Sequence, residues 1–370
     1  MLHLRTRLLP IVVAATLIAA CGGGGDAAAP TSTDASTTAA TSAATTAAAT
    51  DPSTTASTST LPAATTAVET TTTIPVDPVM PLTGMPITDP VLAARPALVV
   101  KIDNHPQARP QFGLNAADIV YEENVEKLTR FAAVFQSQNA ERVGPVRSGR
   151  TQDVDLLGSL NKPLFTWSGG NPNVTNAIRS SDLVELSPSS TRNAGFFRNR
   201  RGKEATEHTL YSGTPAMYLF TPVYAPAPPV QFAYRDDGAA PLGEPNAGVD
   251  LKMDGLTVKW TWDPASVAYL RMQDGKPHND AELGQVNAAN VVILETEYLP
   301  SPADRRSPEA QTIGSGYARV FTGGSFVIGT WTRDDRLKPF TLTTPDGAVI
   351  ELTPGRTWVE LARVGTATPF

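Results

Sequence analysis

Short apolar runs alternate with more polar, helix-like segments between residues 80 and 224. The run 97–103 has the length and composition of a buried strand, and Asn104, His105 and Pro106 end it. The same pattern predicts further strands over 119–122, 129–135 and 164–167, and helices over 153–160 and 174–179. Alternation of this kind is typical of a layered α/β or α+β domain.

The second half of the chain carries mostly strand-like runs. Gly323–Gly324 and Asp346–Gly347 are hairpin turn signals between such runs. A proline-rich break at 225–229, followed by a Gly- and Pro-rich stretch at 237–248, indicates a boundary between two domains. We therefore predict an α/β domain over 80–235 and a mainly β domain over 236–370. The predicted strands of the second domain are 256–261, 267–272, 291–298, 317–321, 326–332 and 358–362.

The first 21 residues have the pattern of a secretory signal. Arg5 and Arg7 precede an apolar run over 8–20, which is too short to cross a bilayer and ends in small residues before Cys21. Bacterial lipoprotein signals place the lipidated cysteine at this position. The alternative is an ordinary cleaved signal with a chance cysteine. We predict a lipoprotein, acylated at Cys21 and anchored to the extracytoplasmic face of the cell membrane.

Residues 22–79 read as a tether between this anchor and the folded part. They are almost wholly Ala, Thr, Ser, Gly and Pro, with no aromatic residue and no Lys or Arg. Such a segment buries too little apolar surface to offset the entropy of ordering it. The sequence therefore predicts a disordered tether.

Charge and cysteine use exclude several kinds of site. Residues 80–370 hold 28 basic and 31 acidic side chains, a balance that does not favour nucleic-acid binding. Cys21 is the only cysteine, and His105, His208 and His278 are the only histidines after His3. Their spacing fits no zinc site, and no cofactor motif is present. We predict neither a metal nor a cofactor.

The segment 144–151 is the strongest candidate for ligand chemistry. It follows a predicted strand, carries Arg147, Ser148 and Arg150, and leads into a predicted helix that starts near Thr151. Free N–H groups at a helix start and two forked guanidinium groups suit a phosphate, pyrophosphate or carboxylate. The alternative is structural: Arg147 and Arg150 pair with Asp153, Asp155 or Glu122. The sequence leaves both open.

Two further groups of residues lie at strand ends. Gly169 and Gly170, in the loop 167–173, would let the backbone approach a ligand closely, although a plain strand-to-helix turn explains them as well. Asp103, His105 and Glu122 are candidates for acid–base chemistry or for a hard cation, and the alternative is a hydrogen-bonded turn.

A series of short motifs runs through the chain from residue 80 onward. They lie, in this order, at 80–84, 101–106, 108–110, 117–122, 129–131, 144–148, Arg150 and 355–358. Together these motifs resemble the YerB-like bacterial lipoproteins. The resemblance implies a two-domain extracytoplasmic protein and adds Arg130 to the candidate site, but it implies no mechanism. At 207–209, this chain has Glu-His-Thr where the family has Pro-His-Asn, which weakens any role for the residues beside His208.

The sequence favours a lipid-anchored, extracytoplasmic binding or scaffold protein that engages an anionic envelope ligand or an envelope protein. The alternative is an enzyme that acts on a phosphorylated or carboxylated envelope substrate. Binding is favoured because no complete set of nucleophile, base and orienting group can be assembled, so no catalytic residue is assigned. The candidate ligand-binding residues are Asp103, His105, Glu122, Arg130, Arg147, Ser148, Arg150, Gly169 and Gly170.

Overall fold

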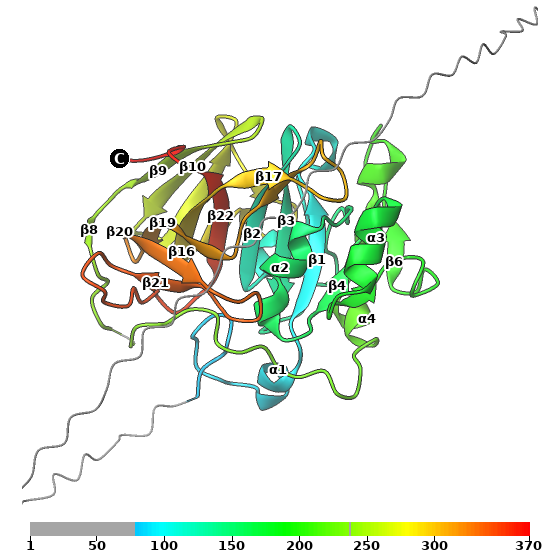
Figure 1. Ribbon diagram of the computed structural model, residues 1–370, viewed down its shortest axis with the longest axis horizontal. Helices are drawn as coiled ribbons and strands as arrows, with labels where there is room; N and C mark the ends of the chain where they lie inside the picture. The colour runs from blue at the N-terminus through cyan, green and yellow to red at the C-terminus, as the bar shows by residue number, and fades with distance from the viewer. Residues whose placement is uncertain (1–77, 237) are drawn as a thin grey trace, which may run out of the picture. The chain divides into compact units, whose positions relative to one another are not determined.

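The computed structural model describes residues 78–236 and 238–370 (Figure 1). The predicted signal, Cys21 and nearly all of the predicted tether lie outside these residues. Within the described ranges, no helix has the length and apolar character needed to cross a membrane.

One large mixed sheet runs through the described chain and takes strands from both halves of the sequence. The halves meet where β2 (Ile119–Val125) pairs in parallel with β22 (Thr357–Arg363), from Ile119 opposite Thr357 to Glu122 opposite Glu360. The first half also contributes β1 (Leu98–Asp103), β3 (Leu128–Phe135), β4 (Leu164–Thr166) and β5 (Val184–Leu186). The second half also contributes β8 (Glu244–Pro245), β16 (Asn290–Thr296), β19 (Gly314–Thr322), β20 (Ser325–Arg333) and β21 (Thr341–Thr343).

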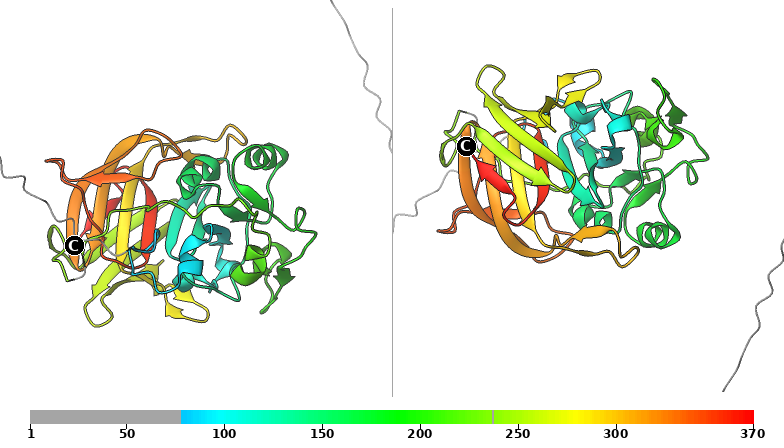
Figure 2. Two further views of the ribbon diagram at one scale, coloured as in Figure 1. Left: turned by 90° about the horizontal axis from the view of Figure 1, so that it is seen from below. Right: turned by 90° about the horizontal axis from the view of Figure 1, so that it is seen from above.

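A second sheet packs against one face of the large sheet (Figure 2). Its strand β10 alternates buried Leu256, Val258 and Trp260 with more exposed residues, as a half-buried strand should. Trp260 meets Trp358 of β22 edge-on, with ring centroids 5.3 Å apart. This sheet consists of β9 (Gly248–Met253), β10 (Leu256–Asp263), β11 (Ala268–Gln273), β12 (Lys276–Pro277), β15 (Asn287–Ala288) and β23 (Ala367–Pro369).

Short helices complete the first half. Residues of α2 (Gln152–Leu156) and α3 (Pro172–Arg179) join the apolar core on the other face of the large sheet. Asn171 caps α3 by accepting the N–H of Val174 at 2.9 Å. The helices α1 (Pro90–Ala94) and α4 (Thr214–Tyr218) were not predicted.

The mixed α/β first half and the mainly β second half confirm the predicted fold class. The helix predicted over 153–160 is shorter, because α2 ends at Leu156 and a 3₁₀ turn follows over Gly158–Leu160. Gly158 lies against backbone there: a Cβ would sit 2.6 Å from the Arg336 carbonyl oxygen. The strand predicted over 291–298 is interrupted, since β16 ends at Thr296 and β17 (Tyr298–Pro300) pairs with β18 (Pro308–Ala310).

Candidate functional site

The ends of β1, β2 and β3 carry polar side chains on both faces of the large sheet. Because neighbouring residues of a strand point to opposite faces, Glu122 and Glu123 are directed to different sides. The register places Asp103 and Glu123 beside Arg130 on the face that α2 and α3 cover. Glu122 lies beside Phe131 on the face that the second sheet covers.

The helix-side face ends in a cavity of about 730 Å³, here called the arginine cavity. Its walls come from the ends of β1 and β22, the β2–β3 hairpin, the segment around Arg147 and the β17–β18 hairpin. Its charged lining consists of Arg130, Arg147, Lys127, Arg305, Arg306 and Arg363 with Asp103, Glu126 and Asp254, and His105 also lines it.

Some of these cations are neutralised inside the protein. Arg363 donates to both carboxylate oxygens of Asp254, at 2.8 and 2.7 Å. Arg147 Nε lies 3.5 Å from Asp103 Oδ2, and Arg306 pairs with Asp304 on the surface. Across 78–236 and 238–370, no carboxylate oxygen lies within 4.0 Å of the charged nitrogens of Arg130, Lys127 or Arg305. The cavity therefore has an excess of positive charge.

Arg130 is the most confined of the three cations without a partner. Its side chain donates one hydrogen bond to the Ser148 carbonyl, at 3.0 Å. Burial and the positive charge of Arg150 and Arg147, against the opposing pull of Asp103, lower the pKa of Arg130 to about 9. A bound anion would stabilise the charged form of such a guanidinium group.

An Asp–His pair adjoins the arginines. Asp103 Oδ2 lies 2.6 Å from His208 Nδ1, and both side chains are nearly fully buried. The other oxygen of Asp103 accepts the His105 backbone N–H at 2.9 Å. The His105 ring stacks on His208 with centroids 4.2 Å apart, and burial with the neighbouring His208 lowers the pKa of His105. An ionised Asp103 would fix the proton of a neutral His208 on Nδ1.

Four predicted residues come together: Asp103, His105, Arg130 and Arg147 all line the arginine cavity. Ser148 contributes its carbonyl to Arg130. The role of His208 was not predicted, because it lies 105 residues from Asp103 in the sequence. Its only local signal is its place within a motif that departs from the family pattern.

Arg150 lies beside this cavity and pairs with Glu126, with 3.2 Å between Nη2 and Oε1. Neither Arg147 nor Arg150 forms the alternative ion pairs with Asp153, Asp155 or Glu122. Asp153 instead accepts from Lys101 Nζ at 2.8 Å and from the Arg150 backbone N–H at 2.7 Å.

The predicted glycine loop lies next to the arginine segment but does not line the cavity. The Ser168 N–H donates to the Arg147 carbonyl at 3.0 Å, so the two segments are neighbours. Gly169 has a φ of +105°, which only glycine adopts easily, and Gly170 packs on Val174. Both glycines are explained by the turn into α3.

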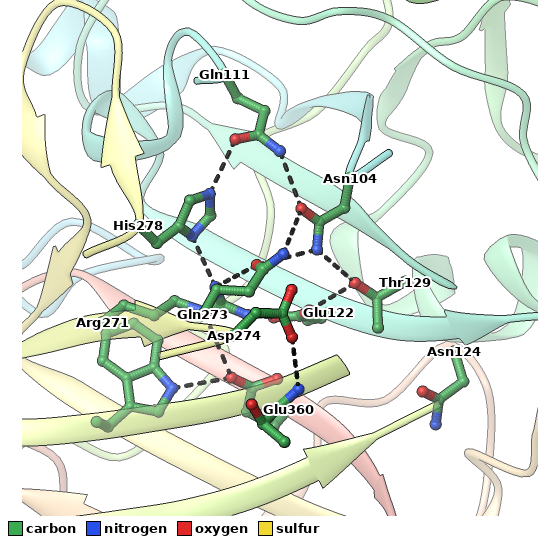
Figure 3. A network of polar contacts seen from close by, with 12 residues as sticks. Asn104, Gln111, Glu122, Asn124, Thr129, Arg271, Gln273, Asp274, His278 and Glu360 are labelled. Carbon is green, nitrogen blue, oxygen red and sulfur yellow. Dashed lines mark hydrogen bonds and ion pairs between the residues drawn. The ribbon is translucent and has the colours of Figure 1, made fainter. Parts of the chain in front are cut away.

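Glu122 belongs to a different cluster, here called the buried network, on the opposite face (Figure 3). Its Oε2 accepts from Arg271 Nη2 at 2.6 Å, and its Oε1 accepts from the Thr129 hydroxyl at 2.7 Å. Glu122 and Arg271 are fully buried, so the prediction that Glu122 belongs to the ligand site is not supported by its position.

The rest of the buried network surrounds Arg271. Its Nη1 donates to Gln273 and to His278 Nδ1, each at 2.7 Å, and His278 Nε2 donates to Gln111 at 2.9 Å. Burial and the charge of Arg271 hold the pKa of His278 well below its usual range. Glu360 accepts from Trp260 Nε1 at 2.9 Å, and burial beside Glu122 raises its pKa well above the usual range.

Metal binding gains no support from the described ranges, where no group of three or more His, Asp or Glu side chains is arranged around a common point. The arginine cavity combines an excess of positive charge with the Asp103–His208 pair beside it.

Comparison with known proteins shows which family this chain matches. The family described as "Protein of unknown function (DUF3048) N-terminal domain" matches residues 82–221, and its C-terminal counterpart matches 249–359. A protein of Bacillus subtilis (strain 168) named "Putative lipoprotein YerB" is 31% identical over 293 residues, which cover 76% of this chain and 85% of that protein. A crystal structure of the YerB protein from Bacillus subtilis superposes with a TM-score of 0.68 at 25% identity, covering 79% of this chain and 99% of that one.

Proposed function

The chain belongs to the DUF3048 family and is similar to a protein named as a putative lipoprotein, and we propose that it is a lipid-anchored extracytoplasmic protein that binds an anionic ligand in the arginine cavity. The single observation that supports this proposal is Arg130: a confined guanidinium group that faces a cavity without a carboxylate partner among the described residues. An unpaired charge costs free energy in the free protein, and an anion would recover it.

The surroundings of Arg130 favour an anion with several oxygens. Arg147 lines the same cavity and shares Asp103 with His208, so its forked donors are only partly used. Lys127 and Arg305 add two cations at exposed positions. Phosphate, pyrophosphate and carboxylate groups match planar, forked donors of this kind. The ligand class is therefore a phosphorylated or carboxylated component of the cell envelope.

Thermal unfolding of the full chain in detergent tests the binding proposal, with inorganic pyrophosphate as the probe and sodium chloride at equal ionic strength as the reference. We expect pyrophosphate to raise the melting temperature of the wild type, because a ligand stabilises the state that binds it. Arg130→Gln should abolish this rise. Arg179→Gln is the matched control, since Arg179 is half-exposed on α3 and pairs with Glu185 outside the cavity. Equal shifts in all three proteins would contradict the proposal.

The anchor is tested separately. Cys21→Ala should release the protein from salt-washed membranes, because the apolar run of the signal is a weaker anchor than several acyl chains. A variant that stays wholly with the membrane after washing would show that lipidation is not the main attachment.

One observation favours an enzyme as a second candidate. Asp103 lines the positive cavity and would orient the His208 ring through Nδ1, which leaves Nε2 as a base for activating water towards a phosphate or carboxylate ester. Release of phosphate or alcohol from envelope ester substrates tests it. Loss of turnover in His208→Gln with retained pyrophosphate binding would support this candidate, whereas binding without turnover in the wild type would leave the protein a binding protein.

A further inference from the structure

An uncharged and exposed surface lies away from the arginine cavity. The segment 217–233 contains no charged residue, yet four of its large side chains are exposed: Leu219 at 85%, Val223 at 107%, Tyr224 at 76% and Val230 at 48%. A soluble protein seldom leaves several large apolar side chains exposed together unless something covers them.

The helix α1 forms the other side of this surface. Val91, 75% exposed, lines a groove of about 680 Å³ with Ala94 on one side and Tyr218, Pro222 and Val223 on the other. Arg95 also lines the groove, and its guanidinium group is held in place there, because it stacks on Tyr218 at 4.1 Å and donates to the carbonyls of residues 136 and 138. We call Val91, Leu219, Val223 and Tyr224, with the groove between them, the apolar face.

The described chain begins beside the apolar face. Pro78 starts the described residues, and the Pro81 carbonyl accepts the Gln231 N–H at 3.1 Å. Tyr234 donates to the Leu82 carbonyl at 2.8 Å. Figure 1 shows α1 and the segment that follows α4 along the same lower edge of the molecule. Met80 and Leu92 of α1 line one groove, so the described chain begins near one side of the apolar face.

The arginine cavity lies at the other end of the same strands. The strand β1 starts three residues after Arg95 and ends at Asp103 in the cavity, and six residues of strand span about 20 Å. The strand β22 runs in the same direction, since it is parallel to β2, and Arg363 at its end also lines the cavity. In Figure 1, β17 of the cavity wall lies near the upper edge, opposite α1.

From these observations we propose that the apolar face docks on the outer leaflet of the membrane, resting on the lipid anchor of the proposed function. Exposed aliphatic and tyrosine side chains suit the boundary between headgroups and acyl chains, and the charged Asp89 and Arg95 beside them can lie among the headgroups. A tethered anchor makes docking an intramolecular event, so a small apolar face is sufficient. Docking in this way holds the cavity about one strand length away from the bilayer. The cavity then faces soluble or wall-borne anions rather than lipid headgroups.

The test uses the full lipidated chain in vesicles of phosphatidylcholine and phosphatidylglycerol. Cys21 is the only natural cysteine and is occupied by lipid, so an introduced cysteine carries an environment-sensitive fluorophore alone. Labels at Val91→Cys and Val223→Cys report on the apolar face. Val364→Cys is the matched control, because Val364 is 65% exposed and follows β22 at the cavity end.

We expect the labels at 91 and 223 to shift their emission to the blue, to lose quenching by aqueous iodide and to gain quenching by nitroxide lipids. The label at 364 should show none of these changes. Adding Leu219→Asp and Tyr224→Asp to the Val91→Cys protein should return its label to an aqueous signal. Both side chains are exposed, so folding should be retained.

Three outcomes would overturn docking: aqueous signals at 91 and 223 in vesicle-bound protein, a membrane signal at 364 as well, or a blue shift without vesicles that grows with protein concentration. The last would assign the apolar face to self-association. Failure of the anchor looks different, because the protein would then not float with the vesicles.

Discussion

The arginine cavity and the buried network are built from opposite faces of the same three strands. They differ in whether their arginine side chains are paired with carboxylates. In the buried network, Arg271 meets Glu122 in a dry interior, with His278 and Gln273 on its remaining donors. In the arginine cavity, Arg130 has one carbonyl partner and faces open space. Both clusters contain arginine, but only the second leaves a guanidinium group available to a ligand.

The difference teaches that arginine content alone does not mark a binding site. A buried ion pair contributes little net stability. Removing one partner nevertheless lowers the free energy of unfolding strongly, because the other partner remains as a buried, uncompensated charge. An arginine without a carboxylate partner costs little to remove, because no buried carboxylate is left unpaired. Substitutions in the buried network should therefore lower the stability of the fold, whereas substitutions of the cavity arginines should change the response to a ligand.

The largest effect is expected for Arg271→Met. It leaves Glu122 in the core without its cation, and it should lower the free energy of unfolding by about 3–5 kcal/mol. Denaturant unfolding measures the change. Glu122→Gln combined with Arg271→Met should recover part of the loss, because no buried charge then remains. A single mutant as stable as the wild type would remove the distinction between the two clusters.

The second effect concerns pH and Glu360. Burial beside Glu122 raises its pKa, so the folded state keeps a proton that the unfolded chain has released above about pH 4.5. The free energy of unfolding should fall as the pH rises from about 4.5 towards the raised pKa of Glu360. This group should contribute a fall of up to about 1.4 kcal/mol per pH unit. Glu360→Gln mimics the protonated form and should remove the fall. Identical pH profiles for variant and wild type would contradict the protonated state.

A smaller effect is expected for Asp103→Asn in the cavity. Asparagine has one acceptor oxygen, which can keep the bond from the His105 N–H, while its amide group can donate to His208 Nδ1 in the other tautomer of the ring. The charge is lost in both bonds, so a loss of about 1 kcal/mol is expected. Denaturant unfolding of Asp103→Asn beside Asp254→Asn, at another cavity carboxylate, checks this. A loss as large as that of Arg271→Met would show that the Asp103–His208 pair is chiefly structural.

The sequence could predict much of this arrangement but not which face would be open. The apolar run 97–103 identifies β1. The two-residue period of a strand places the neighbouring Glu122 and Glu123 of β2 on opposite faces of the sheet. The distinction between the faces depends on Arg271 and Glu360, which reach Glu122 only after the second half has folded against the first. No local pattern encodes contacts between residues that far apart. Arg147, Arg130 and Asp103 could be proposed together because each lies in a family motif near the end of a predicted strand. His208 was missed because it lies 105 residues from Asp103 in the sequence.

The smallest effect on stability, and the sharpest test of the comparison, is expected for Arg130→Gln combined with Arg147→Gln. Removing two neighbouring positive charges relieves their repulsion and costs one carbonyl hydrogen bond at Arg130 and a 3.5 Å ion pair at Arg147. These terms oppose each other, so the free energy of unfolding without ligand should change by less than about 1 kcal/mol. Denaturant unfolding without added anion measures it, with Arg271→Met as the contrasting variant. A loss of about 3–5 kcal/mol would mean that these arginines are held like Arg271. They would then stabilise the fold, and the cavity would have no free guanidinium group to offer an anion.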